Sequence, residues 1–578
     1  MRLCEYINTT REIANFRAIL SVLAAAAKRL DARSASCSNR AMTETQKQSL
    51  DSWTSLDLVK RQAERYGDRV FCTFEHDPPL TFAQFESETD ALASAFADLG
   101  VGPGDRVLTL ALNSRAFLLT MIAVHKRGAI FVPINTELKG DFLAHQFRTV
   151  DPSIVVVDAV LRPAFDSASL GEMRIETTVV IGGAADPLPG TKAVAFDSLA
   201  DTSARPGDVL PAAPQDICTI MFTSGTTGPS KGVMMPHAHC YMFGFGAGRA
   251  TALSEDDRMF ICMPFFHAMG LTIQFTSCLI HGVSAHIVRR FSATSWLDDV
   301  RACEATVTYA LGVMPEFIFR QPETDRDKDN QLRLIVAVPI GEEWGAPFEE
   351  RFDLRLMQAY GMTECNLPAF GDLKDPVMAG CAGYIVEDFY EVRIVDAETD
   401  EALPTGETGE IVVRPTRLSC FMAGYFGMPE RTVDAWRNLW FHTGDAGRFD
   451  ADGRLFFIDR IKDCIRRRGE NISAFEVEQV LNNMPDIAES AVIGVRAEEG
   501  GEEEVKACIV AGGDAPDPVA ILDWCTDRMP RYAVPRYMEF VGELDKTPTG
   551  KLRKQDLRDA GVTPATWDRE TVGYEVRR

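Results

Sequence analysis

Strand-like and helix-like runs alternate over about the first 400 residues of this 578-residue chain, and this alternation constrains its fold most. Apolar residues from Phe82 to Leu99 recur at helical spacing, with Thr81 and Gln84 placed for a capping box and Gly100 for a C-cap. The runs DRVLTLAL and DICTIMF read as buried strands, and FLLTMIAVHKRGAIFVPIN reads as a helix leading into a strand. The alternation predicts an α/β fold with largely parallel sheets flanked by helices.

Beyond about residue 400 the pattern changes to short strands with turn signals. GEIVVRP and DADGRLFFID fit such strands, and DADG fits a hairpin turn. The last part of the chain has helix-like and strand-like runs of its own, AFEVEQVLNNM and AESAVIGV. We therefore expect a large N-terminal domain at 42–460, with a β-rich subdomain, and a small α+β C-terminal domain at 461–578.

The N-terminal extension, residues 1–41, combines the apolar run AILSVLAAAA with arginines and serines. It is compatible with a targeting peptide, with a disordered tail, or with a gene start placed too early, in which case Met42 is the first residue. The sequence has no run of 18 apolar residues, so we expect no stable membrane insertion. The formal net charge of −24 argues against a nucleic-acid partner.

Cysteine and histidine usage bears on redox state and metal binding. The 14 cysteines include no CxxC pair, which indicates reduced thiols, favours the cytoplasm and argues against a structural zinc site. The nine histidines include no HExxH, and the HxH pair of His237 and His239 is a weak metal signal on its own.

The segment TSGTTGPSKG, residues 223–232, directly follows an expected strand. Its glycines let backbone N–H groups approach phosphate oxygens, its hydroxyls donate hydrogen bonds, and its lysine adds positive charge. The order of a Walker A loop is absent, because Ser230 precedes Lys231 and Gly232 follows it. On its own the segment fits either a phosphate-binding loop or a flexible turn.

Four further segments carry polar residues in positions that suit a nucleotide. QAYGMTE places Thr363 and Glu364 after a tight turn, where a carboxylate can hold Mg²⁺. WFHTGDAGRF presents Asp445, whose carboxylate accepts hydrogen bonds as ribose hydroxyls require. IDRIKDCIRRRGEN and KTPTGKLRK, with Lys551, follow. Each segment alone has a simpler interpretation as a turn, a capping residue, a basic surface strip or a polar tail.

In this order the motifs resemble those of the adenylate-forming superfamily of acyl-CoA synthetases, luciferases and peptide-synthetase adenylation domains. The resemblance covers about residues 50–560, and RRRGENISAFEVE and GVTPATWDRE are most similar to the crotonobetaine/carnitine–CoA ligase-like group. It implies a carboxylic acid–CoA ligase that uses ATP and Mg²⁺. A carboxylate and ATP would give an acyl-adenylate and pyrophosphate, and CoA would then displace AMP to give a thioester.

The resemblance also implies residue roles. The residues expected to hold the β- and γ-phosphates are Thr223, Ser224, Gly225, Thr226, Thr227 and Lys231. Tyr360 would lie against adenine, with Gln358 and Ala359 beside it. Thr363 would contact the α-phosphate and Glu364 would bind Mg²⁺, so that both take part in catalysis.

Asp445 would bind the ribose hydroxyls and Arg460 ribose or phosphate oxygens. Lys551 is the expected catalytic residue of adenylation, because its ammonium would bridge the carboxylate and the α-phosphate. In such enzymes the small C-terminal domain then rotates, here about Lys462, and removes this lysine. The residues expected to line the CoA path are Arg466, Arg468 and Gly469. A solvated basic strip is the simpler interpretation of these arginines.

Two features leave the acyl group unassigned. His267 matches a position that lines the acyl pocket or its gate, or it is a core histidine with internal partners. The family's GGAP-like segment is replaced by VAVPIG, at 336–341, so the wall of the adenine and acyl pocket departs from the family pattern. The glycines of CYMFGFGAGRA either make room for a bulky acid or allow close helix packing.

Three other functions stay open. They are an adenylation enzyme that loads a separate carrier protein, an oxygenase of the luciferase kind, and a non-catalytic nucleotide-binding protein on the same fold. A homodimer is compatible with the sequence, which does not reveal the oligomeric state.

Overall fold

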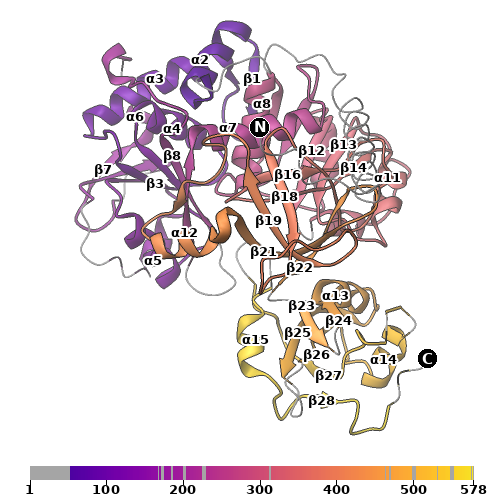
Figure 1. Cartoon of the computed structure of the whole chain (residues 1–578). Helices are drawn as coiled ribbons and strands as arrows, with labels where there is room; N and C mark the ends of the chain where they lie inside the picture. The colour runs from indigo at the N-terminus through magenta and orange to yellow at the C-terminus, as the bar shows by residue number, and fades with distance from the viewer. Residues whose placement is uncertain are drawn as a thin grey trace, which may run out of the picture. The chain divides into compact units, whose positions relative to one another are not determined.

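The computed structural model describes residues 52–578 except 167, 169, 171–174, 184–186, 200–202, 224–229, 312–313, 462–463, 468–469, 497–502, 527, 530, 547–551, 575 and 577–578. The predicted extension, residues 1–41, lies outside the described residues. The described strands form three large sheets and two small ones (Figure 1).

An eight-stranded sheet carries the expected phosphate-binding segment. Its strand order is β20-β9-β8-β4-β3-β5-β6-β7, and only β9 and β20 run antiparallel to their neighbours. The strands are β3 (Arg106–Leu110), β4 (Ile130–Pro133), β5 (Ile154–Asp158), β6 (Thr177–Ile181), β7 (Lys192–Ala195), β8 (Ile217–Thr223), β9 (Lys231–Pro236) and β20 (Gly424–Tyr425). The buried runs of β3, β5 and β8 are typical of strands covered on both faces.

A seven-stranded sheet has the order β14-β13-β12-β10-β11-β1-β2 and is parallel except at β2. Its strands are β1 (Val70–Phe74), β2 (Leu80–Thr81), β10 (Arg258–Ile261), β11 (Ser284–Ile287), β12 (Val307–Leu311), β13 (Leu334–Val338) and β14 (Arg355–Met357). Together, the two sheets confirm the predicted α/β fold with largely parallel sheets.

Helices connect and flank these strands (Figure 1). They are α2 (Ser55–Tyr66), α3 (Phe82–Asp98), α4 (Arg115–Lys126), α5 (Gly140–Val150), α6 (Phe196–Leu199), α7 (His237–Ala250), α8 (Thr276–His281), α9 (Trp296–Ala302), α10 (Met314–Phe319), α11 (Gly345–Phe352) and α12 (Pro429–Ala435). A π-helical segment, Met269–Phe275, precedes α8. The predicted capping box of α3 is confirmed, since Thr81 Oγ1 accepts from Gln84 N at 3.1 Å and Gln84 Oε1 accepts from Thr81 N at 3.0 Å.

The third large sheet is antiparallel, with the order β15-β16-β17-β22-β21-β19-β18. Its strands are β15 (Ala359–Met362), β16 (Asn366–Phe370), β17 (Cys381–Ile385), β18 (Tyr390–Val395), β19 (Gly409–Pro415), β21 (Phe441–Phe449) and β22 (Leu455–Arg460). The hairpin predicted at DADG joins β21 to β22. The change of pattern expected near residue 400 was placed too late, because β16 is buried along its whole length and so reads like a parallel strand.

The C-terminal region has its own core. A two-stranded ladder joins β23 (Cys464–Arg467) and β24 (Glu470–Ser473), and a four-stranded sheet contains β25 (Ile487–Arg496), β26 (Glu503–Ala511), β27 (Tyr537–Phe540) and β28 (Trp567–Asp568). The helices are α13 (Ala474–Asn482), α14 (Pro518–Thr526) and α15 (Gln555–Ala560). Val477, Leu481, Val492, Ile509 and Leu522 pack in this core, which confirms a small α+β domain. The boundary at 460 and 461 stays a prediction.

Within the part of the chain that the structure describes, no helix combines the length and the apolar run needed to cross a membrane.

Candidate functional site

The expected phosphate-binding segment lies between two antiparallel strands. Thr223, at the end of β8, pairs with Lys231, at the start of β9. The segment therefore does not lead from a strand into a helix as a Walker A loop does. Helix α5 anchors its end, because the Ser230 carbonyl contacts His145 Nε2 at 3.1 Å and Gln146 Nε2 donates to Ser230 Oγ at 3.1 Å. Four predicted phosphate ligands lie outside the described residues: Ser224, Gly225, Thr226 and Thr227.

Glu364 lies in the turn between β15 and β16 and is only 4% exposed. Its Oε1 accepts a hydrogen bond from Tyr425 Oη at 3.1 Å, and its Oε2 has no hydrogen-bond partner among the described residues. Burial raises the pKa of Glu364, while Tyr425, Arg460 and Lys231 oppose that rise. A buried carboxylate oxygen without a partner destabilises the free protein unless a ligand contacts it.

Strand β20 brings Tyr425 to this carboxylate. Tyr425 pairs with Val233 of β9 at the edge of the eight-stranded sheet, and Lys231 Nζ lies 4.6 Å from the centre of its ring. The pairing places Lys231, Tyr425 and Glu364 in one cluster. No local motif around Tyr425 predicts this role.

A second residue that the sequence analysis missed fixes the turn before Glu364. His239, on α7, is fully buried, and burial lowers its pKa to about 4. Its neutral Nε2–H donates to the Thr363 carbonyl at 2.8 Å, and its Nδ1 lies 3.3 Å from Asn366 Nδ2. Asn366 has a φ of +72°, a backbone conformation that asparagine tolerates better than most residues. The HxH pair was the signal for His239, but its role here is to position Thr363.

Asp445 lies on β21 and is 3% exposed. Tyr360 Oη donates to its Oδ2 at 2.8 Å, and Arg460 Nε lies 2.8 Å from its Oδ1. Arg460 is its cross-strand neighbour on β22. Burial and the neighbouring Asp445 raise the pKa of Tyr360 well above its usual value, so the phenol stays a donor. The structure thus brings together three residues that the sequence assigned to adenosine.

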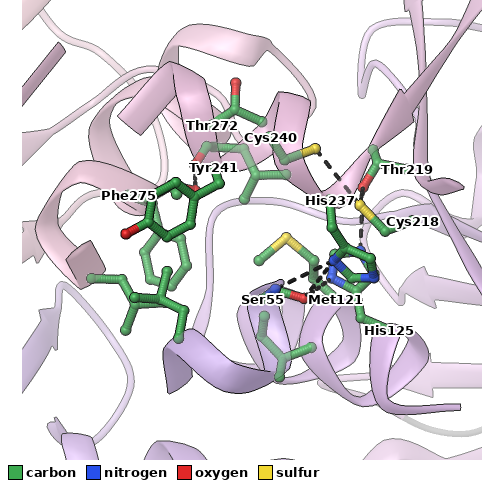
Figure 2. A pocket seen from close by; sticks show the side chains of 15 residues that line it. Ser55, Met121, His125, Cys218, Thr219, His237, Cys240, Tyr241, Thr272 and Phe275 are labelled. Carbon is green, nitrogen blue, oxygen red and sulfur yellow. Dashed lines mark hydrogen bonds between the residues drawn. The ribbon is translucent and has the colours of Figure 1, made fainter. Parts of the chain in front are cut away.

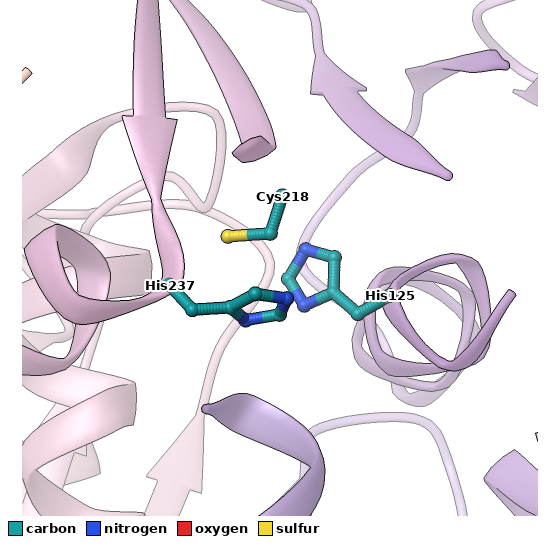
Figure 3. A group of neighbouring side chains, drawn as sticks. All are labelled: His125, Cys218 and His237. Atoms are coloured by element: carbon teal, nitrogen blue, oxygen red, sulfur yellow. The ribbon is translucent and has the colours of Figure 1, made fainter. Parts of the chain in front are cut away.

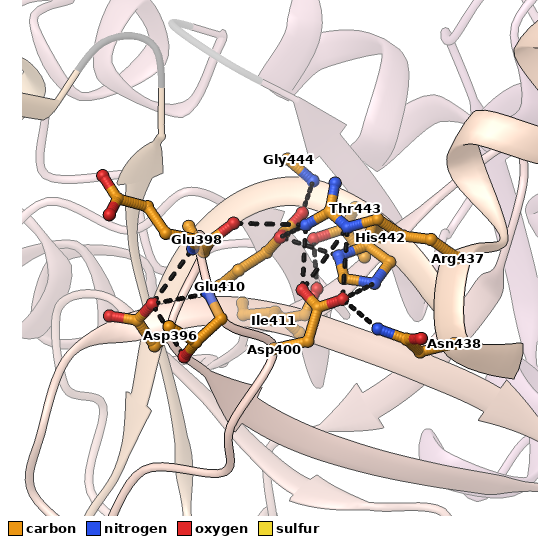
Figure 4. Close-up of polar contacts among 12 residues, drawn as sticks. Asp396, Glu398, Asp400, Glu410, Ile411, Arg437, Asn438, His442, Thr443 and Gly444 are labelled. Carbon is orange, nitrogen blue, oxygen red and sulfur yellow. Dashed lines mark hydrogen bonds and ion pairs between the residues drawn. The ribbon is translucent and has the colours of Figure 1, made fainter.

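A polar network around Glu410, His442 and Gly444 holds the strand that carries Asp445 in place (Figure 4). Glu410 Oε2 lies 2.8 Å from His442 Nδ1, and Glu410 Oε1 accepts from Gly444 N at 3.0 Å. Between these contacts, Thr443 Oγ1 donates to a backbone carbonyl of β19 at 2.6 Å and accepts from Asp445 N at 3.1 Å. Glu410 is therefore a positioning residue for Asp445, and no local sequence pattern around it predicts this role.

The segment that departs from the family pattern contacts the expected adenine residues. Gln358, 5% exposed, accepts a hydrogen bond at its Oε1 from Ile340 N at 3.1 Å. Ala359 and Tyr360 follow on β15, and the Tyr360 ring stacks with Phe457 at 6.0 Å. The backbone of VAVPIG is thus tied to the QAYG segment without a glycine pair.

The residues considered for the acyl group have structural partners. His267 is half-buried, and its Nδ1 accepts from Met269 N at 3.1 Å. A Cβ on Gly244 would lie 2.7 Å from the backbone of α8, and one on Gly248 would lie 2.3 Å from the His281 ring. These glycines therefore allow α7 and α8 to pack closely. Of the two interpretations offered by the sequence, room for a bulky acid or close helix packing, they fit the second. The role of His267 stays a prediction.

The C-terminal candidates are described only in part. Lys462, Arg468, Gly469 and Lys551 lie outside the described residues, and for Arg466 only its place on β23 is described. Its neighbour Arg467 is 2% exposed, with Nε 2.7 Å from Glu504 Oε2, so this arginine is no part of a solvated basic strip. Lys546 and Leu552 form an isolated β-bridge on either side of Lys551.

Comparison with known proteins agrees with this arrangement. The AMP-binding enzyme family matches residues 59–426, and the AMP-binding enzyme C-terminal domain matches residues 476–551. A crotonobetaine/carnitine–CoA ligase from Salmonella paratyphi A is 30% identical over 507 residues, which cover 86% of this chain and 97% of that protein. The protein of the same name from Salmonella typhi gives the same identity and coverage.

Solved structures share the fold. The anthranilate CoA ligase AuaEII in complex with anthranoyl-AMP has a TM-score of 0.77 and 25% identity, covering 90% of this chain and 99% of that one. ATP-bound MatB from Rhodopseudomonas palustris has a TM-score of 0.76 and 24% identity, covering 87% and 98%. Since the family match spans more than half of the chain, and near full-length relatives share 30% of its residues, the protein belongs to the family of AMP-binding enzymes, within the adenylate-forming superfamily that its motifs resemble.

Proposed function

We propose that the protein is an AMP-forming carboxylic acid–CoA ligase. The observation that carries the proposal is the clustering of two buried carboxylates, Glu364 and Asp445, with Lys231, Arg460 and Tyr425. The family and the relatives named as CoA ligases support it.

In the first half-reaction, an oxygen of the substrate carboxylate attacks the α-phosphorus of ATP. The bond from that phosphorus to the bridging oxygen of the β-phosphate breaks, and pyrophosphate leaves with the bonding electrons. Asp445 accepts hydrogen bonds from the ribose hydroxyls, and Lys231 faces the departing phosphates. Lys551 bridges the two reacting anions, which positions them and stabilises the charge that moves between them.

The residues around Glu364 fit Mg²⁺. The unpartnered Oε2 and the hard oxygen donor suit this ion, and burial excludes competing water. When bound, Mg²⁺ would neutralise phosphate charge. Glu364 would hold it, and Tyr425 would orient the carboxylate through the hydrogen bond to Oε1.

In the second half-reaction, the CoA thiol loses its proton, its sulfur attacks the acyl carbon, and AMP leaves with the electrons of the broken acyl–oxygen bond. Arg466, Arg468 and Gly469 would line the CoA path, and arginine suits the phosphates of that nucleotide. Rotation of the C-terminal domain about Lys462 would move Lys551 out of the site and bring the residues of the CoA path into it.

We also propose that the protein is located in the cytoplasm and forms a homodimer. The described cysteines are free thiols, which favours a reducing compartment such as the cytoplasm. The acidic net charge of −24 disfavours nucleic acid as a partner. Light scattering of the purified protein would test the homodimer.

The first test measures AMP and pyrophosphate release with a panel of acids, each with and without CoA. The panel includes short, medium and long fatty acids, aryl acids, steroid side-chain acids and betaines such as carnitine. Acid-dependent AMP release that requires CoA supports the ligase and identifies the acid class. Pyrophosphate exchange with no CoA-dependent turnover would contradict it and indicate a carrier protein. Nucleotide binding with no turnover of any acid would indicate a non-catalytic protein.

A second test separates the half-reactions. Lys551→Ala should lower adenylation by about 10²–10³-fold and spare thioester formation from supplied acyl-adenylate. Lys546→Ala, which removes another lysine nearby in the sequence, is the matched control, since Lys546 pairs with Glu489 at 2.8 Å. An equal loss of rate in both half-reactions would refute the proposal that rotation of the C-terminal domain removes Lys551 before thioester formation.

A further inference from the structure

Two imidazoles and a thiol meet in the interior and use none of the residues assigned above (Figure 3). His125 lies on α4, Cys218 on β8, and His237 is the first residue of α7. Their exposed fractions are 3%, 1% and 4%. One ligand atom from each side chain, a ring nitrogen or the sulfur, lies within 4.8 Å of the other two.

Polar neighbours surround this His–Cys cluster (Figure 2). Ser55 Oγ, at the start of α2, lies 2.9 Å from His125 Nδ1 and 3.2 Å from His237 Nδ1. Cys240 Sγ, on α7, lies 3.7 Å from Cys218 Sγ. The same residues border a cavity of about 30 Å³, which has room for one small ion or one water molecule.

Both ring nitrogens of His125 lie against hydroxyl groups. Its Nδ1 lies 2.9 Å from Ser55 Oγ, and its Nε2 lies 3.2 Å from Thr219 Oγ1. His237 Nδ1 accepts a hydrogen bond from Ser55 N at 3.3 Å. A metal ion bound by a nitrogen that has such a contact would replace that contact.

We propose that His125, Cys218 and His237 bind one Zn²⁺ ion, with Cys240 as the fourth ligand. Sulfur and imidazole nitrogen are the donors that Zn²⁺ prefers in closed structural sites, and tetrahedral Zn²⁺ holds neighbouring donors about 3.3–3.8 Å apart. The Sγ–Sγ distance of 3.7 Å already fits this value. The ligand atoms of the three-residue group lie within 4.8 Å of one another, so side-chain movements of about 1 Å would bring them to these distances.

Such an ion would fasten α4 and α7 to β8, the strand that leads into the segment 224–229. The missing CxxC pair argued against structural zinc, but these ligands come from three separate stretches of the chain, so no short motif can reveal them.

The test uses the full-length, tag-free protein. It is stripped with a chelator under reducing conditions, incubated with Zn²⁺ or Co²⁺, and desalted. We expect one zinc per chain by mass spectrometry, a thiolate-to-Co²⁺ charge-transfer band in the near ultraviolet, and a higher thermal midpoint with Zn²⁺. Cys218→Ser and His237→Asn should lose the zinc, and His125→Gln should weaken its binding.

Matched controls are Cys262→Ser, which changes a buried thiol elsewhere, and His281→Asn, which changes a half-buried imidazole elsewhere. Both should keep the zinc and the cobalt band. Wild-type protein without stoichiometric zinc, or ligand variants that retain it, would overturn the proposal. A disulfide between Cys218 and Cys240 in the reduced, zinc-treated protein would do the same. If a variant fails to fold, the zinc content of the wild-type protein still tests the proposal.

Discussion

The β21–β22 hairpin and the β15–β16 turn each place one carboxylate in the site, and the two carboxylates have opposite surroundings. Asp445, on the hairpin, is 3% exposed, and Tyr360 and Arg460 contact its two oxygens. Glu364, in the turn, is 4% exposed, and among the described residues its side chain accepts a hydrogen bond from Tyr425 alone. Asp445 thus has both a hydrogen bond and an ion pair within the protein, whereas Oε2 of Glu364 has neither among the described residues.

Of the two carboxylates, Glu364 is expected to have the larger effect on kcat. In Glu364→Gln the amide keeps the shape but lacks the charge, so kcat for acid-dependent pyrophosphate release should fall about 100-fold at saturating ATP and Mg²⁺. The control is Glu391→Gln, since Glu391 is an exposed residue of β18 and pairs with Arg414 at 2.6 Å. A wild-type kcat in Glu364→Gln would remove Glu364 from the metal role.

Asp445→Asn tests the other carboxylate. It loses the charge that accepts the ribose hydroxyls, so the Kd for ATP should rise about 10- to 100-fold, with a smaller change in kcat. Calorimetric titration of the variant with ATP measures this. Asp452→Asn serves as the control, because Asp452 lies in the turn of the same hairpin with its side chain 71% exposed. Unchanged ATP affinity would exclude Asp445 from the ribose site.

Without ligands, neutralising the two carboxylates should change the free energy of unfolding in opposite directions. Glu364→Gln should raise the free energy of unfolding by about 1 kcal/mol, because it removes a buried, poorly paired charge, whereas Asp445→Asn should lower it by about 2 kcal/mol. The gain at Glu364 should grow as pH rises from 4.5 through the raised pKa, since folded wild-type then loses a proton that the unfolded chain has already released. Thermal unfolding at several pH values measures this, and shifts of the same sign would break the comparison.

The smallest effect is expected for Tyr425→Phe. The hydrogen bond from Tyr425 opposes the burial that raises the pKa of Glu364, so its loss raises that pKa further. The acid limb of kcat/KM for ATP should move to higher pH, with activity about threefold lower on that limb and little change at high pH. A shift to lower pH would contradict the assignment. Tyr384→Phe is the control, because Tyr384 is exposed and donates to Asp375.

The contrast also explains what the sequence could predict. Thr81 with Gln84, and Asp445 between its glycines, act through local chain geometry, which short patterns encode. Tyr425 and Glu410 act through the pairing of β20 with β9 and of β19 with β21, and such long-range register leaves no local pattern. The early start of the antiparallel sheet was missed because burial of both faces hides the alternation that marks such strands.

The position of β20 at the edge of the eight-stranded sheet has a consequence for synthesis. Strand β9 leaves the ribosome long before Gly424 and Tyr425 do, and in the meantime its outer edge has no β20 to pair with. An unpaired edge can template association with other chains, so the protection of this edge comes late in translation. The strand that brings Tyr425 to Glu364 also covers that edge, so one pairing both completes the surroundings of this carboxylate and protects the sheet from association.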